Sequence, residues 1–295
     1  MKKLLAIGEA LVDIFNEEIK VGGAPLNVCG AYSKLGGKAY FIGKLSNDEY
    51  GVLIKNKMQE FNINNDYVSY TDAPTGKAYI TTLDNGDRSF RFERNNCADQ
   101  LLDEKEIKEE WFKDAFVLHF CSVSLDDYPS KLAHYKAIEY AKKNNCLVSF
   151  DINLRLSLFK DYNKLKKIVF EFMGYADVIK LSYEELVWLG KESKVEELFV
   201  NDVKLILLTL GEDGVICYLK NKEEIKVSGY KVDAIDTTGA GDAFIGAFLY
   251  CLSNYKSKDN LGDILNFANK YSALSVTKKG ALDSYLSINE MKRII

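Results

Sequence analysis

The chain has 295 residues, of which 47% are hydrophobic and only 3 are proline, so it can bury a large core. Its net charge of -4 and its pI near 5.5 argue against a broad nucleic-acid-binding surface. No uninterrupted apolar stretch approaches the length that spans a bilayer. We therefore expect neither nucleic acid nor a membrane as a partner.

The six cysteines form no C-x-x-C pair and no cluster with histidine at zinc-binding spacing. This pattern is typical of buried thiols in a reducing compartment, which predicts a cytoplasmic protein without disulfides. The two histidines, His119 and His134, lie in a strand-like run and an amphipathic helical pattern. Core or surface positions suit them better than catalysis.

Short apolar runs typical of buried strands recur in chain order at 4–7, 39–42, 116–120, 147–150, 178–181 and 205–209. Helical patterns occur between most of them, at 25–36, 48–60, 103–113, 129–144, 160–174 and 182–190. Alternating strands and helices indicate an α/β fold with a mainly parallel sheet that is covered on both faces. We predict three layers, α/β/α, in one domain over residues 1–295.

One segment departs from this alternation. Residues 77–84 and 87–94 flank Asn85-Gly86, a pair favoured in two-residue hairpin turns. Polar and apolar residues alternate there, which predicts a half-exposed hairpin. We expect a lid, or a flap that joins two copies into a homodimer, built from parts of 10–23 and 66–98. A hairpin without function fits the pattern equally well.

The most informative motif is Asp236-Thr237-Thr238-Gly239-Ala240-Gly241-Asp242. Apolar residues at helical spacing follow it, so Gly239, Ala240 and Gly241 lie on a helical first turn, where free backbone N–H groups and the helix dipole favour an anion. An acidic residue at such a position is often only a helix cap. Beside an anion site, Asp242 can also accept a proton from an attacking hydroxyl, which indicates phosphoryl transfer.

A second glycine pair, Gly22-Gly23, precedes a proline suited to a helical first turn, and Asn27 follows closely. The glycine backbone and the Asn27 amide can hydrogen-bond a polyol, and Asp13 is another candidate acceptor. Asn27 can equally be a helix-start residue without further function. The sequence has no P-loop, and no G-x-G-x-x-G turn follows its first strand, which disfavours a dinucleotide oxidoreductase.

The segments Gly22 to Gly51 and Asp236 to Gly246 closely resemble the two signatures of the PfkB (ribokinase-like) carbohydrate kinases. Further motifs occur in the family's order at 8–13, 150–155, 209–214 and 280–281, so the resemblance covers nearly the whole chain. It implies a ribokinase-like fold with a small β lid, ATP as the phosphoryl donor, Mg²⁺, and a monovalent cation such as K⁺.

By this resemblance, Asp242 deprotonates the sugar hydroxyl, and Gly239, Ala240 and Gly241 form the anion hole. Residues matching the family's sugar ligands are Asp13, Gly22, Gly23 and Asn27. Residues matching its ATP site are Ser182, Thr209, Gly211, Gly214, Gly239, Gly241, Asn266 and Asn269. Asp236 and Thr238 match a monovalent-cation site that orders the anion hole.

The family's Asn-x-x-Glu motif appears here as Ser182-Tyr183-Glu184-Glu185. A shorter hydroxyl thus replaces the amide at Ser182, as in kinases of the fructokinase branch, while Glu185 can still orient a Mg²⁺-bound water. Without the resemblance, Glu185 would be interpreted as a solvated charge on a helix.

The Ala24-Pro25 pair after the two glycines resembles fructokinases. We therefore predict an ATP-dependent kinase that phosphorylates the primary hydroxyl of fructose to give fructose 6-phosphate. Arg94 and Arg155 can pair with a sugar-acid carboxylate, which keeps a 2-keto-3-deoxygluconate kinase as the alternative, although both can also be surface arginines paired with neighbouring acids. Another PfkB sugar or nucleoside kinase and a non-catalytic sugar-sensing module are further alternatives.

Overall fold

A nine-stranded sheet forms the centre of the computed structural model, which describes residues 2–15, 18–82, 88–254 and 261–294. Its strand order is β13-β12-β11-β10-β9-β8-β1-β4-β5. Neighbours from β11 to β5 pair in parallel, and β12 and β13 are antiparallel additions at one edge. The strands are β1 (Lys3–Ile7), β4 (Lys38–Ser46), β5 (Val68–Thr71), β8 (Ala115–Cys121), β9 (Leu147–Asp151), β10 (Val178–Ser182), β11 (Leu205–Thr209), β12 (Gly214–Leu219) and β13 (Glu224–Ser228).

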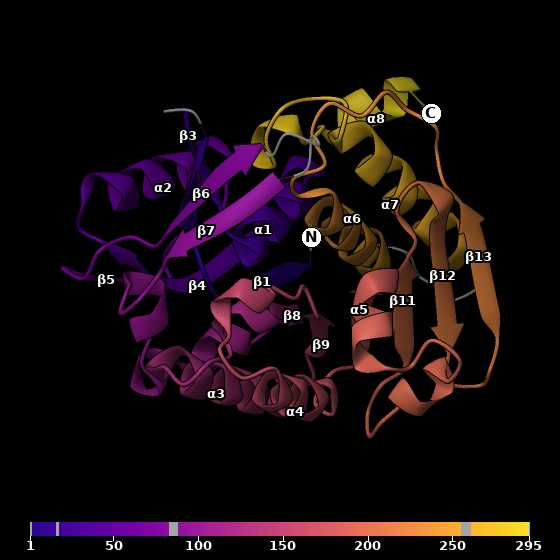
Figure 1. Cartoon of the computed structure of the whole chain (residues 1–295), viewed down its shortest axis with the longest axis horizontal. Helices are drawn as coiled ribbons and strands as arrows, with labels where there is room; N and C mark the ends of the chain where they lie inside the picture. Colours follow the sequence, from indigo (N-terminus) through magenta and orange to yellow (C-terminus); the bar gives the residue numbers. More distant parts are fainter. Residues whose placement is uncertain (1, 16–17, 83–87, 255–260, 295) are drawn as a thin grey trace.

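Helices cover both faces of this sheet, so the predicted three-layer α/β/α architecture is confirmed (Figure 1). One apolar cluster joins the sheet to α1 (Ala24–Lys34), α2 (Glu49–Glu60), α6 (Ala240–Asn254), α7 (Leu261–Ser275) and α8 (Ile288–Ile294). A second cluster on the opposite face contains residues of α3 (Pro129–Lys143), α4 (Tyr162–Met173) and α5 (Tyr183–Leu189).

A separate four-stranded sheet, in the order β3-β2-β6-β7, lies at the position predicted for the lid, and we call it the lid below. Its strands are β2 (Leu11–Phe15), β3 (Glu18–Gly22), β6 (Lys77–Thr82) and β7 (Arg88–Glu93). The predicted hairpin is confirmed as the antiparallel pair β6 and β7, and the predicted Asn85-Gly86 turn lies outside the described residues. Within the predicted range 66–98, β5 joins the central sheet instead of the lid.

The predicted helix at 103–113 is wrong: this segment forms two short 3₁₀ turns, Glu104–Glu106 and Glu109–Phe112. Ile107 and Phe112 are both buried in the core. Five residues of a straight helix turn through about 140° beyond one full turn, so one helix would not point both side chains at the core. Burial of both side chains therefore overrides the segment's helix propensity.

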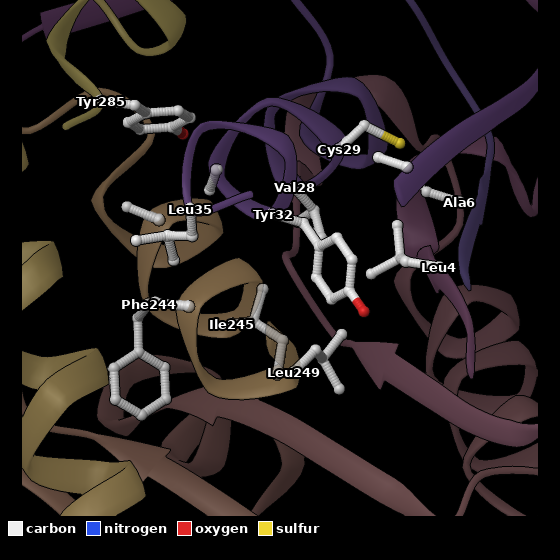
Figure 2. Packing of buried hydrophobic residues seen from close by; sticks show 14 of the residues in the cluster. Leu4, Ala6, Val28, Cys29, Tyr32, Leu35, Phe244, Ile245, Leu249 and Tyr285 are labelled. Carbon is white, nitrogen blue, oxygen red and sulfur yellow. The ribbon is translucent and has the colours of Figure 1, made fainter. Parts of the chain in front are cut away.

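Helices α1 and α6 pack closely, and this contact positions the site. Figure 2 shows Val28 and Tyr32 of α1 beside Ile245 and Leu249 of α6. A methyl group on Gly246 would lie 2.7 Å from Cβ of Ala31, so only glycine permits this approach.

The remaining predictions about core residues are confirmed. All six cysteines are free and buried, and both histidines are fully buried. Burial lowers the pKa of His119 to about 3 and that of His134 to about 4, so both are neutral near pH 7. Among the described helices, none combines the length and apolar character that crossing a bilayer requires.

Candidate active site

The candidate residues gather at the carboxyl ends of the parallel strands, where ligands bind in open α/β sheets. Asp151, Ser182 and Thr209 are the last residues of β9, β10 and β11. Asp13 lies on β2 of the lid, and Asn27 and Asp242 lie in the first turns of α1 and α6.

The glycine turn before α6 has the geometry of an anion site. Gly239 has φ 77°, and its carbonyl oxygen accepts hydrogen bonds from the Ala243 amide at 2.8 Å and the Tyr285 hydroxyl at 3.0 Å. The bond from Ala243 is the first i to i-4 bond of the helix, so the amides of Gly241 and Asp242 lie in the turn that precedes it. These amides, with the helix dipole, are suited to a phosphoryl group.

Asp242 is buried, and the side-chain amide of Asn27 donates to its Oδ2 at 2.8 Å. Burial raises the pKa of Asp242, and the hydrogen bond from Asn27 and the charge of Lys180 partly oppose this rise. Oδ1 of Asn27 is also buried and has no hydrogen-bond partner within the described part of the chain. Asn27 thus holds the carboxylate with one atom and leaves an acceptor for a hydroxyl compound.

The second glycine turn, Gly22-Gly23, lies beside Asp13, whose carboxylate is close to that of Asp242. A methyl group on Gly22 would lie 2.5 Å from Oδ2 of Asp13, and one on Gly23, which has φ 119°, would lie 2.4 Å from the carbonyl oxygen of Glu9. Burial raises the pKa of Asp13 to about 6, and the nearby charge of Asp242 adds to this rise. The structure therefore brings Asp13, Gly22 and Gly23 together with the glycine turn before α6.

Lys180 in the buried strand β10 was missed by the sequence analysis. Its Nζ lies 2.9 Å from Oδ2 of Asp151, and a methyl group on Gly241 would lie 2.7 Å from the same Nζ. Burial disfavours its charged form, but the carboxylates of Asp151, Glu185 and Asp242 raise its pKa above the ordinary value. A lysine within the apolar run 178–181 was the available signal, because buried lysines are rare unless paired.

Ser182 and Glu185 form the capping box of α5: Oε2 of Glu185 accepts from the Ser182 amide at 2.8 Å. Oε1 of Glu185 accepts from the Leu154 amide at 2.7 Å. Glu185 is half-buried, and desolvation raises its pKa while the charge of Lys180 opposes the rise. Each carboxylate oxygen retains a lone pair that a metal-bound water could use.

The predicted ATP residues lie along the neighbouring strand ends. Gly211 has φ 60°, and a methyl group there would contact nothing within 4 Å, whereas one on Gly214 would lie 2.1 Å from the Val227 carbonyl oxygen. Gly211 therefore faces open space, and Gly214 packs against β13. The Thr209 hydroxyl donates to the Leu181 carbonyl at 3.3 Å.

Two asparagines of α7 hydrogen-bond the end of β13 and the chain that follows it. The side-chain amide of Asn269 donates to the Ser228 carbonyl at 2.8 Å, and Oδ1 of Asn266 accepts from the Tyr230 hydroxyl at 2.8 Å.

Asp236 connects two loops at the anion turn. Its Oδ1 accepts from the Thr238 amide and its Oδ2 from the Gly280 amide, both at 2.9 Å. Asp236, Thr238 and Gly280 line a pocket together with Asp13 and Lys20 of the lid. The lid and the anion turn thus face one another across this pocket.

The two candidate arginines differ in environment. Arg155 is exposed, and its charge lowers the pKa values of Asp13 and Asp242 against the larger effect of burial, so it lies near the site. The Arg94 side chain is only 3% exposed and forms an ion pair with Asp99 at 2.5 Å. These contacts favour the interpretation of Arg94 as an arginine paired with a neighbouring acid, but inside the protein and not on its surface.

A buried carboxylate beside a glycine-rich helical first turn, on a ribokinase-like fold, is the arrangement of a phosphotransferase of the sugar-kinase class. The model of the pfkB family of carbohydrate kinases matches residues 3–288. The chain therefore belongs to the pfkB family of carbohydrate kinases.

Similar proteins are known by sequence and by structure. Probable fructokinase-4 of Arabidopsis thaliana is 37% identical over 284 residues, which cover 93% of this chain and 87% of the relative. The crystal structure of a fructokinase with bound ATP from Xylella fastidiosa superposes with a TM-score of 0.93 at 28% identity, over 99% of this chain and 98% of that one. A fructokinase double mutant from Vibrio cholerae O395, with fructose, ADP and potassium bound, superposes with a TM-score of 0.90 at 31% identity, over 99% and 98% of the two chains.

Proposed function

We propose that this protein is an ATP-dependent fructokinase that transfers the γ-phosphoryl group of ATP to the primary hydroxyl of fructose. The hydrogen bond between Asn27 and Asp242 carries this proposal, because it joins the turn suited to a sugar with the turn suited to a phosphoryl group. The choice of fructose is supported by the names of the relatives and of the solved structures.

In this mechanism, Asp242 accepts the proton of the primary hydroxyl as its oxygen attacks the γ-phosphorus. A phosphorus–oxygen bond forms to the sugar, the bond to the bridging oxygen of ADP breaks, and ADP leaves with that electron pair. Asp13, the Gly22-Gly23 backbone and Oδ1 of Asn27 would hold the sugar hydroxyls. Burial of Asp242 suits this role, because a raised pKa makes the carboxylate a better proton acceptor.

The charge that develops on the transferred group would be stabilised by the amides of Gly239, Gly241 and Asp242 and by the ammonium group of Lys180. The Ala240 amide instead donates to the Thr237 carbonyl oxygen at 3.2 Å. Lys180 is positioned to stabilise this charge by its ion pair with Asp151. Open space at Gly211 and the side chains of Ser182 and Thr209 would admit the remaining phosphates, with Gly214, Asn266 and Asn269 shaping the nucleotide site.

Mg²⁺ neutralises phosphate charge when bound with ATP and keeps several waters, because it dehydrates reluctantly. Glu185 would orient such a water through the lone pairs that its two amide contacts leave. Asp236 and Thr238 would hold a monovalent cation such as K⁺ behind the anion turn, and the two loop contacts of Asp236 fit that task.

We place the protein in the cytoplasm, on the basis of its six free, buried cysteines. We also propose a homodimer through the lid, because β3 and β7 are edge strands of its sheet and edge strands tend to pair with another chain. Concentration-dependent light scattering tests the dimer, and a monomer at all concentrations would contradict it.

The deciding experiment measures ADP release with fructose, 2-keto-3-deoxygluconate, ribose and nucleosides as acceptors. We expect the highest kcat/KM for fructose. Preference for 2-keto-3-deoxygluconate would support the alternative, a 2-keto-3-deoxygluconate kinase. The Arg155 guanidinium near the site suits the carboxylate of that substrate. Binding of a sugar without turnover of any acceptor would support the non-catalytic sugar-sensing module.

A further inference from the structure

The root of the lid contains a buried group of charges that the proposed mechanism does not use. Arg94 directly follows β7, where the lid chain returns to the body. Its Nε and Nη2 lie 2.7 Å and 2.5 Å from Oδ2 of Asp99, and its Nη1 donates to the Val123 carbonyl at 2.9 Å. A methyl group on Gly76, which directly precedes β6, would lie 3.4 Å from Cγ of Arg94. Arg94 therefore lies beside Gly76, so it is close to both ends of the hairpin formed by β6 and β7.

A second buried acid contacts the sugar turn. Glu9 is 2% exposed, and its Oε1 accepts a 3.0 Å hydrogen bond from the amide of Ala24, the first residue of α1. Gly23 at the N-cap of α1 has no side chain that could cap the helix. The carboxylate of Glu9 performs this task from a distant part of the sequence. The carbonyl oxygen of Glu9 also borders Gly23, so Glu9 contacts the turn through its backbone and its side chain.

Ser124 joins these two groups. Its hydroxyl donates to Oε2 of Glu9 at 3.0 Å and accepts a hydrogen bond from Nη2 of Arg94 at 3.3 Å. Ser124 is 2% exposed, so solvent does not replace either contact. A continuous chain of hydrogen bonds thus runs from the Ala24 amide through Glu9, Ser124 and Arg94 to Asp99.

We propose that Glu9, Ser124 and Arg94 are positioning residues that hold the sugar-binding turn in a fixed relation to the root of the lid. They act through the backbone of Gly23 and Ala24 and do not touch the sugar. This inference rests on the proposed role of residues 22–27 as the sugar turn. It assigns Arg94 a function different from the sugar contact that the sequence predicts.

The direct test is Ser124→Ala, which removes one hydroxyl and leaves both charged partners in place. We expect the KM for fructose to rise about tenfold, as for the loss of a hydrogen bond between a neutral and a charged group. The KM for ATP and kcat should stay within about twofold of the wild-type values, because the anion turn has no part in this hydrogen-bond chain. The control is Ser149→Ala, which removes an equally buried hydroxyl whose contact is Nδ1 of His119, and it should leave the KM for fructose unchanged.

A double-mutant cycle with Glu9→Gln separates positioning from general destabilisation. If Ser124 acts through Glu9, Ser124→Ala should raise the KM for fructose much less in the Glu9→Gln background than in the wild type. Equal effects in the two backgrounds, or equal rises in the KM values for fructose and ATP, would overturn the proposal.

Hydrogen exchange on the ligand-free protein tests the same coupling without any turnover. Ser124→Ala should speed exchange both at residues 22–27 and in the described lid strands 77–82 and 88–93, whereas Ser149→Ala should not. If the wild-type enzyme phosphorylates none of the acceptors, the proposed function is wrong. Hydrogen exchange still tests whether Ser124 couples residues 22–27 to the lid strands. Exchange in Ser124→Ala that matches the wild type in both segments would contradict it.

Discussion

The side-chain amide of Asn27 donates to Oδ2 of Asp242 across the contact between α1 and α6, at 2.8 Å. Each residue lies four positions, about one helical turn, before a residue of a close contact between the two helices, Ala31 on α1 and Gly246 on α6. Helix packing thus sets the distance between the proposed sugar turn and the proposed base.

Replacement of Asp242 by asparagine should lower kcat by at least about 10²-fold, the low end of a general-base contribution. The new amide oxygen can still accept from Asn27, so fructose affinity, measured by calorimetry, should change only modestly. Thermal unfolding serves as the folding control. Near-wild-type turnover in a pure, folded sample would rule out Asp242 as the base.

Asn27→Ala should shift the pH dependence of kcat to higher pH. Burial already raises the pKa of Asp242, and loss of the amide donor removes an interaction that lowers it. The carboxylate would then be protonated up to a higher pH, and the loss of rate should be larger in mild acid than in mild base. A raised fructose KM with an unchanged kcat profile would mean that Asn27 serves only as a sugar ligand.

Fructose affinity should depend on the ionisation of Asp13, whose pKa burial raises from 3.8 to about 6. The ionised form is the pure acceptor for sugar hydroxyls, so affinity should fall as pH drops through about 6, by up to about tenfold per pH unit below it. The stability of the free protein depends on pH in the opposite direction. As pH falls, Asp13 takes up its proton in the folded chain before it does so in the unfolded chain. This group alone therefore raises the free energy of unfolding as pH falls from about 6 to 3.8. Calorimetric titrations at several pH values give the affinity, and Asp13→Asn should bind more weakly and lose this pH dependence.

Lys180→Met should reduce both stability and turnover. The substitution leaves Asp151 buried without its cation, and breaking a buried ion pair costs about 3–5 kcal/mol. It also removes the cation beside Gly241, so kcat should fall. The double variant Lys180→Met with Asp151→Leu removes both charges, and chemical denaturation should show recovered stability while kcat stays low. Recovery of both quantities would show that Lys180 acts only in the fold.

The parts of the molecule that depend on local pattern could be predicted from the sequence. The apolar runs predicted every parallel strand of the central sheet except β5, and the spacing after Gly241 placed Asp242 in a helical first turn. The helix predicted at 103–113 failed, because the burial of Ile107 and Phe112 is decided by the rest of the fold.

Contacts between distant segments could not be predicted in the same way. Nζ of Lys180 lies beside Gly241 only because the fold brings β10 and the first turn of α6 together. The run 178–181 signals a paired lysine but does not identify its neighbours. Arg94 is likewise buried by partners 29 and 30 residues away, Val123 and Ser124. For charged residues in apolar surroundings, the local sequence pattern therefore does not predict which residues they pair with or what function they have.

Gly246→Ala tests whether the approach of α1 to α6 sets the catalytic geometry. The added methyl group would lie 2.7 Å from Cβ of Ala31, so the helices must move apart, at a cost of about 1–3 kcal/mol. This exceeds or matches the gain of about 1 kcal/mol in helix propensity. We expect lower stability together with a kcat reduced by about tenfold, because small displacements of reacting groups are costly.

Gly262→Ala in α7 is the matched control: the nearest atom to its methyl group would be 4.0 Å away, so neither stability nor kcat should fall. A destabilised Gly246→Ala enzyme with wild-type kcat would show that the Asn27 to Asp242 distance tolerates this shift.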